Sequence, residues 1–182
     1  MTQTVNQPFQ PPPAELAESD PVAFTRQYAG FWLAEGNAVR PFTMPSLVDG
    51  PAAFSAALIR CRGQLDRMEE LMRSAKSLHG GLRRRAAELR AIADDAWDAA
   101  ARAEQRRGAR SGNDFESAKE RAARFNLASF NENRTARQFS LAADMASDAA
   151  DRLHDMHMGL STTRADLIAI IRGFVPESSL DR

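Results

Sequence analysis

Apolar and small side chains recur at alternating intervals of four and three residues through the centre of the chain. The series is Phe54, Leu58, Cys61, Leu65, Met68, Met72, Ala75, His79, Leu82, Ala86, Leu89, Ala93, Ala96, Ala100 and Ala103. A period of 3.5 residues keeps one seam of a helix facing a partner helix along its whole length. The pattern therefore predicts a long coiled-coil helix that begins near residue 52.

A second long helix is predicted after a turn at residues 108–113, where Asp114 can cap it. Its apolar positions form an early series of Phe115, Ala118, Ala122 and Phe125, and a later series of Met145, Ala149, Leu153, Met156, Leu160, Thr163, Leu167, Ile170 and Phe174. Between the two series, Leu127, Phe130, Phe139 and Leu141 fall off register. We therefore expect a stutter in the middle of this helix.

Folding the second helix back on the first gives an all-α, antiparallel helical hairpin over residues 52–175, with a short tail at 176–182. The register places His79 near Ala142. It also sets basic residues opposite part of an acidic row on the return helix: Arg73 and Lys76 should face Asp148 and Asp144. Ion pairs between such positions would satisfy much of the local charge within the chain.

Two adjacent glycines, Gly80 and Gly81, interrupt the helix-forming composition of the first long helix. Together they cost about 2 kcal/mol of helix propensity relative to alanine. The heptad series nevertheless passes through them without a change of phase. We therefore expect the helix to continue through the pair, with at most a mild bend.

Residues 1–19 contain Pro8 and the run Pro11–Pro13, which favours extended backbone. This segment is predicted to be an extended, proline-rich arm. Phe9 and Leu16 are its candidate anchors, because they are its large apolar side chains. The arm is ordered only if its own body or another chain provides a surface to hold it.

A short helix is predicted at residues 20–36, where Asp20 and Pro21 provide a favourable start and Gly36 an end. Its aromatic side chains are Phe24, Tyr28, Phe31 and Trp32. The cluster has two interpretations: it packs onto the coiled coil, or it docks on another protein. A proline-containing loop at residues 37–51 connects this helix to the coiled coil.

The chain carries 24 basic and 24 acidic residues, so its net charge does not point to nucleic acid or to an anionic membrane. Basic residues are concentrated in the first long helix. The candidate anion-binding residues are Arg83, Arg84, Arg85, Arg90, Arg106 and Arg107. Acidic residues are interleaved with them, so a solvated helix face is the favoured interpretation and a nucleic-acid surface is the alternative.

No catalytic residue is assigned, and neither a metal nor a cofactor is expected. Cys61 and His79 occupy seam positions, which suits a buried thiol and a polar residue that marks register. Asp151, His154 and Asp155 share a helix face with Met158, but His157 lies elsewhere and no second helix supplies matching ligands. Phosphate-binding glycine loops and known hydrolase motifs are also missing from the sequence, which argues against an enzyme.

Toward the predicted turn the seam consists of alanines, which bury little apolar area. Trp97 is a candidate contact there for a third helix or a partner chain. The sequence shows neither a charged-then-apolar leader nor an apolar run of membrane-spanning length. We therefore expect no membrane insertion, and residence in the cytoplasm or in a virion or other large complex.

These features favour a non-enzymatic structural or adaptor protein of a larger assembly, with virion and scaffold components as architectural analogues. Its partners would be proteins, either further copies of itself or other subunits, held by coiled-coil and arm contacts. The alternative function is a helical accessory subunit of a nucleoprotein or transcription complex that uses the arginine-rich helix.

Overall fold

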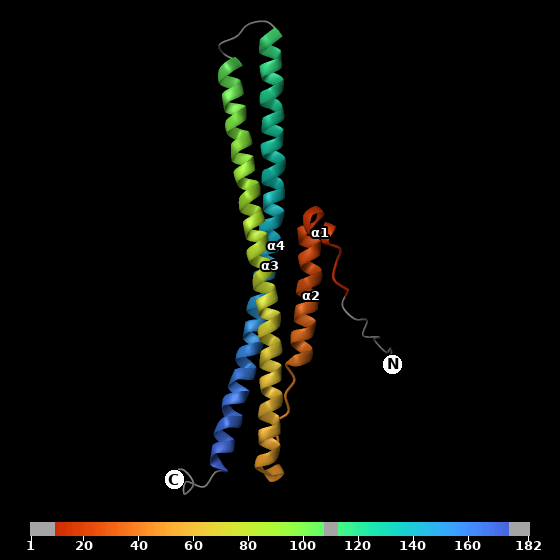
Figure 1. Ribbon diagram of the computed structural model, residues 1–182, viewed down its shortest axis with the longest axis vertical. Coiled ribbons are helices and arrows are strands. Elements are labelled where there is room, and N and C mark those ends of the chain that lie inside the picture. The colour runs from red at the N-terminus through yellow and green to blue at the C-terminus, as the bar shows by residue number, and fades with distance from the viewer. Residues whose placement is uncertain (1–9, 108–112, 175–182) are drawn as a thin grey trace. The chain divides into compact units, whose positions relative to one another are not determined.

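The computed structural model describes residues 10–107 and 113–174 (Figure 1). Its elements are α1 (Ala14–Ser19), α2 (Pro21–Val39), the 3₁₀ turn η1 (Leu47–Asp49), α3 (Gly50–Arg107) and α4 (Asn113–Gly173). Across these described ranges there is no β-strand. The predicted all-α class is therefore confirmed.

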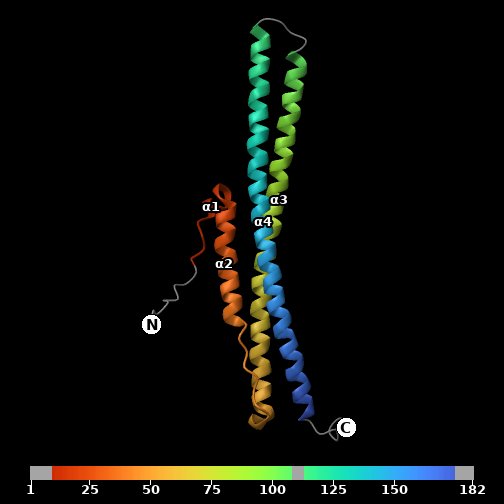
Figure 2. The ribbon, with the colours of Figure 1, turned by 180° about the vertical axis from the view of Figure 1, so that it is seen from behind.

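The chain divides into two compact units, and each unit contains part of both long helices. Unit 1 includes Gln27–Ser77 and the chain from Ala146 onward, whereas unit 2 includes Pro12–Arg26 and Leu78–Met145. Within each unit, α3 and α4 run antiparallel and side by side (Figures 1 and 2). This arrangement confirms the predicted helical hairpin.

The seam of α3 is the one that the heptad pattern predicts, because every position of the series is buried or half-buried. In unit 1 the Sγ atom of Cys61 lies 3.5 Å from the carbonyl oxygen of Leu160. In unit 2 Nδ1 of His79 lies 2.9 Å from the carbonyl oxygen of Ala143. The second contact is one residue away from the predicted neighbour Ala142, so the predicted register is confirmed.

The stutter predicted in the second long helix is wrong. Buried and half-buried positions of α4 keep a single alternation of three and four through that region: Ser129, Glu132, Ala136, Phe139, Ala143, Ala146, Ala150 and Leu153. Phe139, which falls outside the predicted series, belongs to this seam and is 3% exposed. The apparent phase change arises because a second row of apolar residues runs beside the seam.

In unit 1 this second row includes residues of both long helices that lie against α2, namely Gln64 and Met156. On α3 the row consists of Ala57, Gln64 and Leu71, and on α4 it consists of Ala149, Met156 and Thr163; all six are buried or half-buried. The amide Nε2 of Gln64 donates hydrogen bonds to the carbonyl oxygens of Val39, at 2.6 Å, and Pro41, at 3.0 Å. These bonds fix the C-terminal end of α2 on α3, and both ribbon views show the two helices side by side.

Gly36 does not end α2, contrary to the prediction, because the helix continues to Val39. A Cβ atom at Gly36 would lie 2.7 Å from Cδ2 of Leu153 and 3.1 Å from Sδ of Met156. The glycine therefore allows α2 to approach α4 closely within unit 1. Its role is in packing rather than in helix termination.

The N-terminal segment departs from the prediction at residues 14–19, which form α1 instead of extended backbone. Proline is well tolerated just before or at the start of a helix, and the backbone N–H of Leu16 donates to the carbonyl of Pro13 at 3.0 Å. The predicted start of α2 is confirmed, because Oδ1 of Asp20 accepts a hydrogen bond from the N–H of Ala23 at 2.9 Å.

The connection between α2 and α3 ends in a capped turn. Oδ2 of Asp49 accepts a hydrogen bond from the backbone N–H of Ser46 at 2.8 Å. Gly50 then adopts a positive φ of 77°, a conformation that glycine tolerates best. Further along, Gly80 and Gly81 lie inside α3 without interrupting it, so the predicted continuity of this helix is confirmed.

Candidate protein interaction surfaces

The aromatic side chains of α2 pack largely inside the molecule. Trp32 is 2% exposed, and its ring centroid lies 5.5 Å from that of Tyr28 within unit 1. Phe24, Phe31 and Tyr28 are half-buried and take part in further interactions. Of the two interpretations of this cluster, packing onto the coiled coil is the one that the burial of Trp32 supports.

Of the two predicted anchors of the N-terminal arm, the structure describes only one. Leu16 lies in α1 and is half-buried in unit 2. Phe9 lies outside the described residues. A role for either residue in binding a partner stays a prediction.

Three of the six candidate anion-binding arginines are engaged with neighbours in unit 2. Arg83 pairs with Asp144 at 2.5 Å, and Nη2 of Arg90 donates to Oγ of Ser140 at 2.7 Å. Arg85 contacts Glu88 at 3.3 Å and Glu18 of α1 at 3.4 Å. Hydrogen bonding to Glu88, followed by the charge of Glu18, raises the pKa of the Arg85 guanidinium above its ordinary value.

The other members of that arginine set are Arg84, Arg106 and Arg107. Arg84 is exposed on α3. Arg106 and Arg107 end α3, and their side chains fall outside the described part of the molecule. Because Arg83, Arg85 and Arg90 are held by internal partners, the arrangement favours the interpretation of this region as a solvated helix face.

The acidic row of α4 is not paired as predicted. Within unit 2, Asp144 pairs with Arg83, whose long guanidinium side chain reaches it from α3. Within the described part of unit 1, no ion pair joins Arg73 to Asp148. All of these side chains are exposed, so their ion pairs contribute little to stability.

The histidines are placed in or beside the seam. Because a carbonyl oxygen only accepts, Nδ1 of His79 carries the proton in its contact with Ala143. Nε2 of His157 lies 3.5 Å from Oε1 of Glu69, a contact between α4 and α3 that the sequence patterns did not reveal. The His154 ring stacks near that of His157, with centroids 6.5 Å apart.

Within residues 10–107 and 113–174, no group of three or more histidine, cysteine or acidic side chains has the geometry to hold a metal ion. Asp151, His154, Asp155 and Met158 are exposed on α4, whereas His157 is half-buried toward α3. These five residues are close in the sequence, but four of their side chains point to solvent and that of His157 points toward α3.

Cys61 is fully buried in the seam of unit 1. Burial raises the pKa of its thiol, and the positive charge of Arg164 opposes that effect. Because the thiolate is the reactive form, the buried thiol is suited to packing and poorly suited to nucleophilic chemistry.

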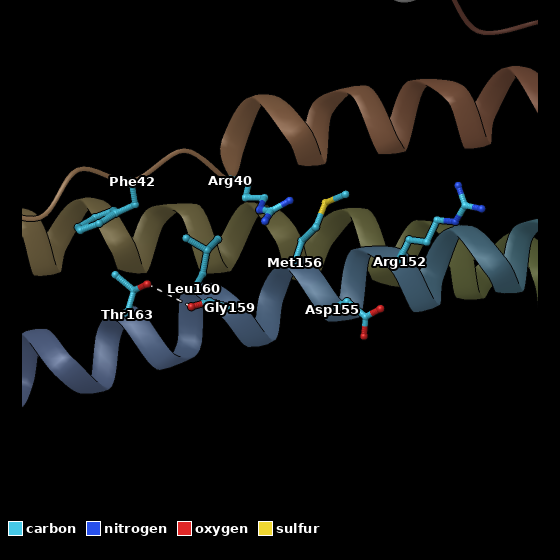
Figure 3. Close-up of a pocket in the computed structure, with 8 residues that line it drawn as sticks. All are labelled: Arg40, Phe42, Arg152, Asp155, Met156, Gly159, Leu160 and Thr163. Atoms are coloured by element: carbon cyan, nitrogen blue, oxygen red, sulfur yellow. Dashed lines mark hydrogen bonds between the residues drawn. The ribbon is translucent and has the colours of Figure 1, made fainter.

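A groove of about 510 Å³ lies in unit 1 between α4 and the segment that follows α2 (Figure 3). Phe42, Met156 and Leu160 give it an apolar lining, while Arg40 and Arg152 provide positive charge. Oγ1 of Thr163 donates to the carbonyl of Gly159 at 3.1 Å, so this hydroxyl is used within its own helix. The groove therefore offers contact surface without a pair of nucleophile and base.

Unit 2 exposes large apolar side chains, most of which the sequence patterns assign to no surface. They are Trp97 (63% exposed), Ile92 (48%), Phe125 (39%), Leu127 (61%), Phe130 (66%) and Leu141 (54%). Of these, Leu127, Phe130 and Leu141 are the residues that fall off register in the sequence. Their departure from the heptad pattern is the sequence signal that could have identified them as exposed. An apolar residue outside the seam of two packed helices has no neighbouring helix to pack against.

Two faces of unit 2 carry these side chains together with charge. The basic-apolar face of α4 consists of Arg124, Leu127, Phe130, Arg134 and Arg137, all exposed. The acidic face of α3 consists of Asp94, Asp95, Asp98 and the neighbouring Trp97, which are also exposed. Apolar side chains ringed by charge are typical of protein interaction surfaces.

Comparison with family models, curated proteins and solved structures finds no match to this chain. In addition, no helix in the described part combines the length and the hydropathy needed to cross a lipid bilayer. The functional interpretation therefore depends on the geometry of the surfaces themselves.

Proposed function

We propose that this protein is a non-enzymatic structural or adaptor component of a larger assembly, which it joins through protein contacts. The observation that supports this proposal is the exposure of large apolar side chains on unit 2. Phe130, Trp97 and Leu127 are each more than 60% exposed. Large exposed apolar side chains that lie near charged ones are typical of sites that a partner covers.

The architecture suits this role. The seam of α3 and α4 holds the two helices together, so the outward faces of unit 2 are left for contacts with other molecules. Aromatic and arginine side chains, which dominate binding energy in protein interfaces, are both present on the basic-apolar face. Phe130 lies between Leu127 and Arg134 on that face.

We do not propose the nucleoprotein function as a second candidate. Arg83, Arg85 and Arg90 already have partners within unit 2. A nucleic-acid surface would require these contacts to be exchanged for phosphate contacts.

Site-specific photo-crosslinking tests the proposed function. A photoreactive amino acid is placed at Phe130 and, as a matched control, at the exposed Arg60 of α3 in unit 1. After irradiation in cells, we expect covalent adducts with protein chains at Phe130 in clear excess over those at Arg60. Equal yields at the two positions would contradict the assignment of this face as an interaction surface.

A further inference from the structure

The two charged faces lie on opposite sides of the helix pair in unit 2. On α3, Ala93 and Ala100 turn toward the seam and are buried, whereas Asp94 and Asp98 are exposed. On α4, the buried Ser129 marks the seam side. The exposed Leu127 and Phe130 lie on the side away from α3. One copy of the protein therefore presents an acidic face on one flank and a basic-apolar face on the other.

Two pairs of opposite charges lie at matching levels on the two sides of the helix pair. The contact between His79 and Ala143 fixes the register. Counted along the helices from that contact, Asp98 of α3 and Arg124 of α4 lie at the same level.

Four residues further toward the end of the hairpin on each helix, the signs are reversed. Here α3 carries Arg102 and α4 carries Glu120, again at the same level as each other. At these two levels, the charge on one side is thus opposite in sign to the charge on the other.

Among the described residues, no ion pair or hydrogen bond involves the side chains of Asp98, Arg102, Glu120 or Arg124. All four are exposed. Their complementarity is therefore available to another molecule.

Resting on the function proposed above, we propose that the partner of these faces is a second copy of this chain. The basic-apolar α4 face of one copy packs against the acidic α3 face of the next, with the copies parallel and at the same level. Asp98 then meets Arg124 of the neighbour, and Arg102 meets its Glu120. Trp97 covers Leu127 and Phe130, which removes apolar surface from water.

Pairing of unlike faces excludes a simple two-fold dimer through either face. A two-fold contact would bring the arginines of the basic-apolar face against each other, and like charges in contact oppose association. Each copy instead keeps one free face after pairing. Association of this kind continues to further copies unless a rotation closes it into a ring.

Charge reversal tests the proposal on the full chain. One variant carries Asp94→Arg and Asp98→Arg, and the other carries Arg124→Asp and Arg134→Asp. Light scattering and sedimentation at low salt should show concentration-dependent association of the wild type, and each variant alone should associate about tenfold more weakly. An equimolar mixture of the two variants should restore association, because each supplies the face that the other lost.

A control variant with Arg60→Glu and Arg73→Glu changes exposed charges of unit 1 and should associate like the wild type. Restoration in the mixture also shows that both reversed variants are folded. A mixture that stays as weak as its components would overturn the proposal. A wild-type chain that remains monomeric at every concentration would overturn it too. If Phe130 nevertheless crosslinks to a different protein, the proposed function stands and self-pairing alone fails.

Single substitutions at Arg102 and Glu120 test whether these two positions meet when two copies pair. Arg102→Glu and Glu120→Arg should each weaken association, and the double variant should recover it, because the pair is then restored with its charges exchanged. A double variant weaker than both single variants would show that these two positions do not meet.

Discussion

Two glycines of α2 occupy different environments inside the same helix. Gly36 is buried against Leu153 and Met156, whereas Gly30 is exposed, and a methyl group added to it would have no neighbour within 4 Å. The first glycine is therefore required by packing. The second only lowers helix propensity.

Substitution by alanine should separate these two roles. Gly36→Ala is expected to destabilise the protein by about 1–3 kcal/mol, because its methyl group overpacks the contact with Leu153. Gly30→Ala should stabilise it by about 0.5–1 kcal/mol through helix propensity. Urea denaturation followed by circular dichroism measures both. Equal effects of the two substitutions would show that α2 does not approach α4 closely at Gly36.

The Cys61 thiol should link stability to alkaline pH. Because burial raises its pKa in the folded state, the stability that it contributes is complete below its ordinary value of 9.0. That contribution is lost as the pH rises through the raised value. The free energy of unfolding should therefore fall with pH in this range more steeply for the wild type than for Cys61→Ala. Identical pH profiles for the two proteins would rule out a buried thiol.

At the scale of the helix, the two glycines in the middle of α3 reduce its stability without breaking it. Nothing lies within 4 Å of a methyl group at either Gly80 or Gly81, so both positions have room for alanine. The double substitution Gly80→Ala and Gly81→Ala should stabilise the protein by about 2 kcal/mol. Thermal unfolding measures the gain, and a loss of stability would mean that the glycines are needed for a bend.

The first long helix is predictable because its apolar pattern keeps one period. Phe54 to Ala103 keep a single register, and the structure uses that register. The second helix is harder to interpret because large apolar residues stand in both of its rows in unit 1. On α4, Leu153 lies in the seam with α3, whereas Met156 lies toward α2. Residues of both rows alternate in the sequence, and this mixture resembles a change of phase.

The ends of short elements are less predictable than the hairpin. Tertiary packing carries α2 past Gly36, because that glycine fits against α4. Local bonding converts residues 14–19 into α1, although the upstream prolines favour extended backbone. Neither effect is visible in the spacing of apolar residues.

The candidate surfaces are predictable only in part. The docking of Trp32 is one of two interpretations that the aromatic spacing allows. The exposure of Phe130 requires knowledge of which residues the seam uses, since an off-register residue is exposed only when no third helix covers it. The contact between Glu69 and His157 depends on the packing of two distant segments, which no local pattern encodes.

For the molecule as a whole, the seam differs in composition between the two units. In unit 1 it contains Leu65, Met68 and Leu153, which are large side chains with little exposure. In unit 2, beyond Leu89, it consists mainly of Ala93, Ala100 and other small residues. Smaller side chains bury less apolar area, so this part of the seam gains less free energy from packing.

Hydrogen exchange should therefore show unequal protection along α3. Backbone amides at residues 93–103 are expected to exchange at least about tenfold faster than those at residues 65–72, because local opening costs less where less area is buried. Ala96→Leu should slow exchange nearby, whereas Leu at the exposed Ala91 should not. Uniform protection along the helix would mean that the alanine seam is stabilised by contacts other than its own.

The unbroken three-four register on both sides of the hairpin also bears on how such a protein changes its length. A segment of seven residues added to α3, together with seven added at the same level of α4, returns every downstream side chain to its original side. Each such paired insertion lengthens the helix pair by about 10 Å. An insertion in one helix alone would turn its later residues away from their partners. The length of this hairpin is therefore free to change in evolution only in matched steps.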